Sequence, residues 1–245
     1  MPDQPHPFAF PQYVIDRVMA KRGRLNVYDH FPKGETALLV IDMQAFYVAE
    51  IATTRGIVPN INRLAAAMRE RGDPVIWVCM TAGKDQQSLW SLYHDHFFTP
   101  QKAAAHRDNL TEGAKGHELY AALDAQPRDL HVWKTRFSPF IAGSSNLESI
   151  LRARHIRNLV IAGTATNMCC ETTARDAMML DYRVMMVSDA NAARYDEDHA
   201  AGLSSFYQSF GDVRETDDVI RNVLNVRPPD HGASGGAPSV ATPVK

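Results

Sequence analysis

The stretch that decides the fold is residues 158–177, NLVIAGTATNMCCETTARDA. Its first seven residues form a nearly continuous apolar run, which is typical of a strand buried on both faces of a parallel sheet. The segment that follows is rich in Ala and Met and predicts a helix over residues 167–181. A strand that leads directly into a helix is one half of a βαβ unit, from which parallel sheets are built.

The same alternation extends in both directions along the chain. Further strands are expected at residues 36–43, 74–81, 130–135 and 183–190, with a short one near 213–216, and further helices at 60–71, 144–155, 197–210 and near 217–224. This pattern predicts an α/β fold, a Rossmann-like three-layer sandwich in which a six-stranded parallel sheet is flanked by helices. Such sheets place their sites beyond the carboxyl ends of the strands.

The chain divides into three segments. Residues 1–35 form an N-terminal arm with a proline-rich start and an amphipathic helix expected at 14–24, and such an arm is a candidate for packing on a neighbouring subunit. Residues 36–226 form the α/β domain. Residues 227–245 are rich in Gly, Pro, Ser and Ala and are expected to be disordered.

Composition excludes several classes of function. The chain has 245 residues, 45% of them hydrophobic, and a net charge of −2, so it offers no basic field for a nucleic acid partner. No apolar run approaches the roughly 18–20 residues of a membrane span, and the N-terminus lacks the early positive charge of a signal peptide. Three cysteines, two of them adjacent, cannot form a disulfide framework and favour a reducing, cytoplasmic location.

Three of the predicted strands end in reactive side chains. Asp42 ends the first, Lys134 ends the third, and Cys169 follows the fourth at the start of a helix. In a parallel sheet all three project from the same edge and meet in one pocket. A helix N-terminus and a nearby ammonium favour the thiolate form of a cysteine, while a carboxylate can take the thiol proton and return it to a leaving amine.

Each residue alone has a plainer interpretation. An Asp after a strand often caps a turn or helix, a Lys at a strand end is usually solvated, and Cys169 beside Cys170 can be a small core residue. The coincidence at three strand ends is what favours a catalytic site.

Three motifs resemble those of the isochorismatase-like cysteine hydrolase superfamily: IDMQ at 41–44, WKTRFSPF at 133–140 and GTATNMCCETTARDA at 163–177. The resemblance covers roughly residues 36–224 and points within the superfamily to the N-carbamoylsarcosine amidase and ureidoacrylate amidohydrolase types. It implies that Asp42 is the general base, Lys134 the lysine of the triad and Cys169 the nucleophile. It also implies a cis peptide at Thr164–Ala165, an oxyanion site at the amides of Ala165 and Cys169, and assembly as a homodimer or homotetramer.

Two differences between this sequence and other members of the superfamily restrict the reaction that we expect. Members that cleave the vinyl ether of isochorismate lack the cysteine, so Cys169 favours amide chemistry. Nicotinamidases carry an Asp-x-His metal motif after the second strand, which this chain lacks, so we expect no metal and no other cofactor. His94, Asp95 and His96 are dense enough to suggest ligands, but a solvated or structural loop is the expected role.

Candidate substrate-binding residues lie around the same edge. Arg194 follows the fifth strand, and the resemblance implies that an arginine here binds a substrate carboxylate; a surface ion pair with Asp196 or Glu197 is the alternative. Side chains expected to line the pocket are Gln44, Tyr47, Trp90, Phe137 and Phe140.

The expected function is therefore hydrolysis of a C–N bond in a small carbamoyl or ureido acid, with a thioester intermediate and release of ammonia. One alternative is an amidase of the same scaffold that acts on a neutral carboxamide, as nicotinamidases do. Another is a catalytically silent binding protein, which the intact Asp42, Lys134 and Cys169 argue against. A nucleotide-binding oxidoreductase is disfavoured because no GxGxxG follows any predicted strand.

Overall fold

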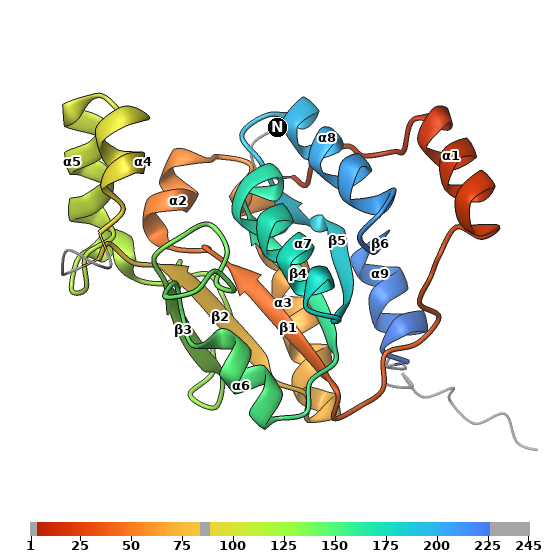
Figure 1. The fold of residues 1–245 in the computed structure, drawn as a ribbon. Helices are drawn as coiled ribbons and strands as arrows, with labels where there is room; N and C mark the ends of the chain where they lie inside the picture. Colours follow the sequence, from red (N-terminus) through yellow and green to blue (C-terminus); the bar gives the residue numbers. More distant parts are fainter. Residues whose placement is uncertain (1–3, 84–88, 226–245) are drawn as a thin grey trace, which may run out of the picture.

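A six-stranded, all-parallel sheet forms the centre of the computed structural model, which describes residues 4–83 and 89–225 (Figure 1). The strand order is β3-β2-β1-β4-β5-β6. The strands are β1 (Thr36–Ile41), β2 (Val75–Met80), β3 (Leu130–Lys134), β4 (Asn158–Thr164), β5 (Arg183–Ala192) and β6 (Asp212–Arg214). The predicted fold class is confirmed.

Apolar side chains of the central strand alternate between two hydrophobic cores, one on each face of the sheet. In β1, Leu38 and Val40 join one core, and Leu39 and Ile41 join the other. The first core includes residues of α3 (Thr54–Arg71) and of the turn η3 (Val219–Val223), which follows the short α9 (Thr216–Asp218). The second core packs against α1 (Gln12–Arg22), α6 (Leu147–Ala153), α7 (Glu171–Met179) and α8 (Asp196–Tyr207). The result is a three-layer sandwich.

The strand order turns back at the middle of the sheet. From β1 the chain builds outward through β2 to β3, and then crosses over so that β4 pairs with the free edge of β1. In open α/β sheets the crevice at such a switch point, beyond the carboxyl ends of the strands, is where ligands bind. The ends of β1 and β4 are therefore the place to look for a site.

A glycine permits the close approach of these two strands. Gly163 has a φ of 120°, and a Cβ placed on it would lie 2.1 Å from the Ile41 carbonyl oxygen. No other residue type tolerates both the conformation and the contact. The GTATN segment is thereby held against the residue that follows β1, which is Asp42.

The observed helices differ from the predicted ones in segments that contain a proline or many polar residues. Helix α3 begins at Thr54 rather than near residue 60 and contains Pro59, a residue type that is rare inside helices. The polar stretch at 82–116 contains α4 (Ser91–His96), α5 (Pro100–Asn109) and the turn η1 (Lys115–His117). A short helix, α2 (Ala45–Glu50), follows β1 directly. Such short elements carry too few apolar positions for a helical period to show.

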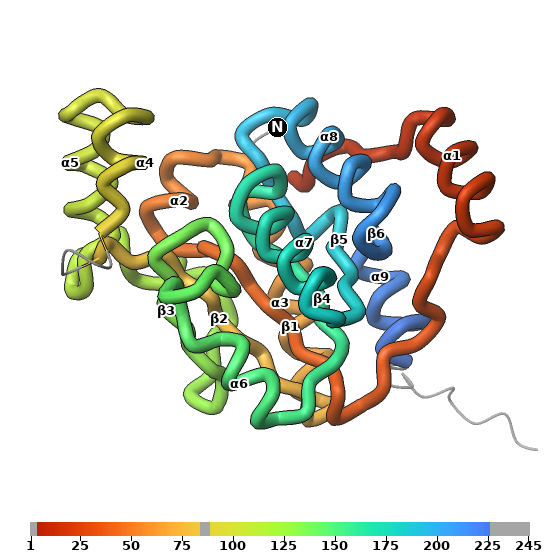
Figure 2. The backbone as a smooth tube through the Cα atoms, in the orientation of Figure 1, coloured from red at the N-terminus to blue at the C-terminus, as the bar shows by residue number. Residues whose placement is uncertain are grey.

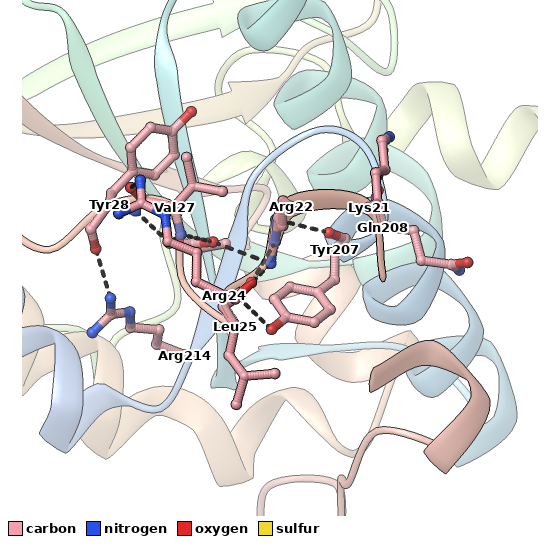
Figure 3. A network of polar contacts seen from close by, with 10 residues as sticks. Lys21, Arg22, Arg24, Leu25, Val27, Tyr28, Tyr207, Gln208 and Arg214 are labelled. Atoms are coloured by element: carbon pink, nitrogen blue, oxygen red, sulfur yellow. Dashed lines mark hydrogen bonds and ion pairs between the residues drawn. The ribbon is translucent and has the colours of Figure 1, made fainter. Parts of the chain in front are cut away.

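The described part of the N-terminal arm packs on the domain of its own chain. Figure 2 shows the arm beside the last strand and helices of the chain. In the network of Figure 3, the Tyr207 hydroxyl donates to the Leu25 carbonyl (2.5 Å), and Arg214 donates to the Tyr28 carbonyl (2.6 Å). The backbone N–H groups of Val27 and Tyr28 donate to the buried carboxylate of Asp212 at 2.8 Å. Whether the arm also meets a neighbouring subunit stays a prediction.

The sequence also predicts a disordered C-terminal tail and the absence of a membrane span. The tail predicted to be disordered, residues 227–245, lies outside the described residues. Across the part of the chain that is described, no helix has the length and apolar character to cross a bilayer.

Candidate active site

The side chains of Asp42, Lys134 and Cys169 meet at the carboxyl ends of β1, β3 and β4. The Lys134 ammonium donates to Asp42 Oδ2 (2.7 Å) and to Cys169 Sγ (3.4 Å). It also donates to the Arg136 carbonyl at 3.2 Å. The lysine is fully buried, and Asp42 and Cys169 are 1% and 6% exposed. An acid, an ammonium and a thiol therefore share one site that is almost closed to solvent.

Asp42 stands in an unusual backbone conformation. Its φ is 49°, in the left-handed region that residues other than glycine seldom adopt, and its N–H donates to the Val78 carbonyl (2.8 Å). Backbone outliers of this kind are concentrated at functional sites. Its second oxygen, Oδ1, is buried and has no hydrogen-bond partner among the residues that the structure describes. This oxygen is free to accept a proton.

The surroundings of Cys169 disfavour its thiolate form. Burial raises the pKa of Cys169, the charge of Asp42 raises it further, and Lys134 only partly opposes them. The helix and the ammonium considered from the sequence favour the thiolate, but the effect of burial, which those residues do not reveal, is larger. Burial also raises the pKa of Asp42, against the effect of Lys134, which makes the carboxylate a better proton acceptor.

Lys134 stays charged despite its burial. Burial alone would lower its pKa, but the charge of Asp42 beside it outweighs this and raises the pKa. The ammonium therefore offsets negative charge at whichever of the two partners carries it.

The segment after β4 has the backbone geometry that the resemblance implies. The peptide bond between Thr164 and Ala165 is cis. Ala165 precedes a π-helical turn, η2 (Thr166–Cys170), which leads into α7 and contains Cys169. Both Ala165 and Cys169 line the same cavity.

That cavity has a volume of about 270 Å³ and opens beside the thiol. Its wall is mostly aromatic and apolar, with a few polar side chains, as in small-molecule sites. The apolar lining consists of Phe46, Tyr47, Ile51, Tyr93, Phe98, Phe137 and Met168, and the polar lining beyond Asp42 and Cys169 includes Glu50, His106, Asn167, Arg194 and Asp198.

The structure places the six predicted pocket residues in different positions. Tyr47, Phe137 and Arg194 line the cavity. Trp90 lies behind the wall, where its ring is 4.5 Å from that of Tyr93 and 4.7 Å from that of Phe137. It supports the lining rather than forming it.

Gln44 and Phe140 lie away from the cavity, contrary to the prediction. Gln44 is fully buried, and its amide donates to the carbonyls of Met80 and His117 (both 2.9 Å) and accepts from the Met80 N–H (2.8 Å). Because these bonds use both ends of the amide, it ties the end of β1 to the end of β2. Phe140 packs against the second core and lies 5.9 Å from the Tyr182 ring.

Arg194 has an ion-pair partner that the sequence does not indicate. Its guanidinium is 3.6 Å from Glu50, and both side chains are about half exposed. Asp196, the partner considered from the sequence, instead contacts His6 Nδ1 of the arm (2.5 Å). Glu50 ends α2, a helix too short to predict, so no local signal placed it beside Arg194.

His94 and His96 do not form a metal site with each other. Both ring nitrogens of His94 are in hydrogen bonds, to the Trp90 carbonyl and to His106 (3.0 Å each). His96 and Asp95 are exposed on α4. Throughout residues 4–83 and 89–225 no group of three or more His, Cys, Asp or Glu side chains is arranged to hold a metal ion.

Comparison with known proteins identifies the family. Residues 36–218 match the isochorismatase domain. A ureidoacrylate amidohydrolase of Pseudomonas savastanoi is 33% identical over 214 residues, which cover 80% of this chain and 86% of the relative. A protein of Arabidopsis thaliana named as a probable inactive nicotinamidase is 37% identical over 175 residues, covering 69% and 86%.

Solved structures agree with this assignment. A cysteine hydrolase from Pseudomonas syringae superposes with a TM-score of 0.71 at 29% identity, covering 81% of this chain and 96% of that one. The N-carbamoylsarcosine amidase of Thermoplasma acidophilum superposes with a TM-score of 0.59 at 26% identity, covering 75% and 97%.

Proposed function

Because the chain belongs to the isochorismatase family of hydrolases, we propose that it is a cysteine-dependent amidohydrolase of a small carbamoyl or ureido acid. The observation that carries the proposal is the buried contact of Lys134 with both Asp42 and Cys169 at the wall of a small cavity. The names of the ureidoacrylate amidohydrolase and N-carbamoylsarcosine amidase relatives support the substrate class.

In this mechanism Asp42 takes the thiol proton as sulfur attacks the substrate carbonyl carbon. The amides of Ala165 and Cys169 donate to the oxyanion of the tetrahedral intermediate. Asp42 then returns the proton to the scissile nitrogen, the C–N bond breaks, and ammonia leaves. Water hydrolyses the resulting thioester, with Asp42 again as base, and the thiol is restored. Lys134 keeps its positive charge beside Asp42 and Cys169 while the proton moves, and so compensates the negative charge on either of them.

The test is ammonia release from N-carbamoylsarcosine, N-carbamoylglycine and nicotinamide, with mass spectrometry of the quenched enzyme. We expect turnover of at least one carbamoyl acid and an adduct on the Cys169 peptide. A protein that binds these compounds but releases no ammonia from any of them would be a silent binding protein, contrary to the proposal.

We assign the substrate carboxylate to Arg194, which lines the cavity. A guanidinium presents two parallel donors that match a carboxylate. Glu50 occupies this position at 3.6 Å, so an incoming carboxylate competes with it. The competition is mild, because half-exposed ion pairs contribute little.

Removing Arg194 is expected to impair carboxylate-bearing substrates selectively. Arg194→Ala should lower kcat/KM by about 10–150-fold, toward the lower end because the guanidinium is half exposed, and mainly through KM. Arg194→Lys should recover only part of the loss, since it lacks the planar fork.

The matched control is Glu50→Gln, which removes the competitor and keeps its size. It should raise kcat/KM for carboxylates by about two- to fivefold. Steady-state kinetics on N-carbamoylglycine and on nicotinamide measure both effects. Equal losses in Arg194→Ala for the charged and the neutral substrate would show that Arg194 is structural.

The acids at the cavity favour a second candidate, the hydrolysis of a neutral carboxamide. Glu50 pairs with Arg194, and Asp198 adds a further negative charge to the lining. Such a site offers less net attraction to an anion. Preference for nicotinamide over both carbamoyl acids in the ammonia assay would select this candidate.

Full activity is expected to survive exhaustive chelation. Protein groups alone supply the nucleophile, the base and the oxyanion donors in the mechanism, and both ring nitrogens of His94 are already hydrogen-bonded. Activity after dialysis against EDTA, with and without added zinc or manganese, measures this. Loss that a metal restores would contradict the expectation and make His94 and His96 the first ligands to examine.

A further inference from the structure

A chain of hydrogen bonds runs from the cavity wall into the α4–α5 hairpin. The Tyr47 hydroxyl contacts His106 Nε2 (3.2 Å), His106 Nδ1 contacts His94 Nε2 (3.0 Å), and His94 Nδ1 contacts the Trp90 carbonyl (3.0 Å). Both histidines are buried, at 8% and 6% exposure. The mechanism above uses neither of them.

The Trp90 carbonyl, at the end of this series of hydrogen bonds, fixes which atom donates and which accepts in each of them. The Trp90 carbonyl can only accept, so His94 Nδ1 carries a proton and donates. A neutral His94 then has a bare Nε2, which accepts from His106 Nδ1–H. A neutral His106 in turn has a bare Nε2, and the Tyr47 hydroxyl must donate to it.

The surroundings keep both rings neutral. Burial lowers the pKa of His106 to about 4, and the neighbouring His94 and Lys134 act in the same direction. Burial likewise lowers the pKa of His94. The rings of Phe46 and Phe98 lie 5.7 Å and 5.3 Å from the His106 ring and offer no acceptor for a second proton.

We propose that His94 and His106 are positioning residues that commit the Tyr47 proton to His106, so that the Tyr47 oxygen faces the cavity as an acceptor for the scissile NH2 group of the substrate. The inference rests on the proposed function, because it names the substrate group that Tyr47 contacts. Tyr47 lines the cavity together with Cys169 and Asp42. With its proton committed, its oxygen cannot donate to the oxyanion.

An acceptor at this position helps most when the nitrogen leaves. As sulfur adds to the carbonyl and the nitrogen gains a proton, its N–H groups become stronger donors. The hydrogen bond to Tyr47 therefore strengthens in the transition state, which lowers the barrier rather than only tightening binding. The expected effect lies in kcat as well as in kcat/KM.

Matched amides and esters isolate this contact. N-carbamoylsarcosine and N-methoxycarbonylsarcosine give the same acyl-enzyme, and the only N–H groups of the amide are on its leaving nitrogen. Nicotinamide and methyl nicotinate form a neutral pair with the same property. The ratio of kcat/KM for amide and ester reports the N–H contact, because kcat/KM covers only the steps up to the acyl-enzyme, which is the same for both.

Tyr47→Phe is expected to lower the amide-to-ester ratio about tenfold, and His106→Phe should lower it in the same direction. His106→Gln should restore most of it, since the amide oxygen of Gln can accept the Tyr47 proton. Phe140→Leu, at a ring outside the cavity, is the control and should leave the ratio unchanged. Equal falls for amide and ester in Tyr47→Phe would overturn the proposal, because they indicate an oxyanion donor or a structural role.

A second measurement does not depend on turnover. In 15N-labelled protein, the imidazole nitrogen shifts should show the Nδ1–H form for both His94 and His106 at neutral pH. An Nε2–H or doubly protonated His106 would overturn the proposal. If no amide or ester is hydrolysed, the proposed function fails, and the nitrogen shifts still decide the direction of the chain.

Discussion

Cys169→Ser is expected to lower kcat by about 10⁴–10⁶-fold for any amide that the protein hydrolyses. A serine hydroxyl is far less acidic than a thiol, so Asp42, which takes the proton as sulfur attacks, has too little driving force to take it from oxygen. Ammonia release under single-turnover conditions measures the loss. Circular dichroism and thermal unfolding should show that the variant keeps the fold.

The neighbouring cysteine provides the matched control. Cys170 is fully buried in the second core, whereas Cys169 is 6% exposed and lines the cavity. Cys170→Ala should keep most of the activity, and iodoacetamide should label Cys169 before Cys170 or Cys79. Inactivation that accompanies labelling of Cys170 or Cys79 would refute the assignment of the nucleophile.

Lys134→Met is expected to destabilise the protein by about 3–5 kcal/mol and to abolish activity. The substitution introduces an apolar side chain that is one heavy atom shorter, and it leaves Asp42, 1% exposed, without the ammonium at 2.7 Å. A buried charge that loses its partner keeps its desolvation cost and loses the compensating attraction. Urea unfolding followed by fluorescence measures the change.

The double variant Asp42→Asn/Lys134→Met separates charge from packing. Asn tolerates the left-handed backbone at position 42 and carries no charge. The double variant should therefore regain at least half of the stability lost in Lys134→Met while staying inactive. If it is less stable than Lys134→Met, the loss comes from packing around the lysine stem and not from the unpaired carboxylate.

The sheet and the meeting of Asp42, Lys134 and Cys169 follow from local sequence. Long apolar runs identify strands buried on both faces, and the parallel order brings the ends of separate strands to one edge. The three reactive residues could thus be placed together without knowledge of any loop. Their pKa values could not, because the raised pKa of Cys169 depends first on burial by the whole fold.

The cavity wall was harder to predict, since it comes from short elements whose position depends on tertiary contacts. Glu50 and His106 reach the cavity from α2 and α5, which lack a clear helical period in the sequence. Gln44 is the opposite case, a residue that was predicted to line the cavity and lies outside it. It lies two residues after Asp42, but its amide is used by the backbone of β2 and η1.

The strand order also determines the order in which the three residues of the site are synthesised. Asp42 and Lys134 belong to the half of the sheet that leaves the ribosome first, while Cys169 follows 35 residues after the lysine. At about 5–20 residues per second, the nascent chain holds its acid and ammonium for about 2–7 seconds before the thiol is synthesised. The sulfur is therefore added to a chain that already contains its two charged partners, and in the finished sheet β4 pairs with β1 beside them. A chain stalled before this point contains the Cys79 thiol but lacks Cys169, the proposed nucleophile.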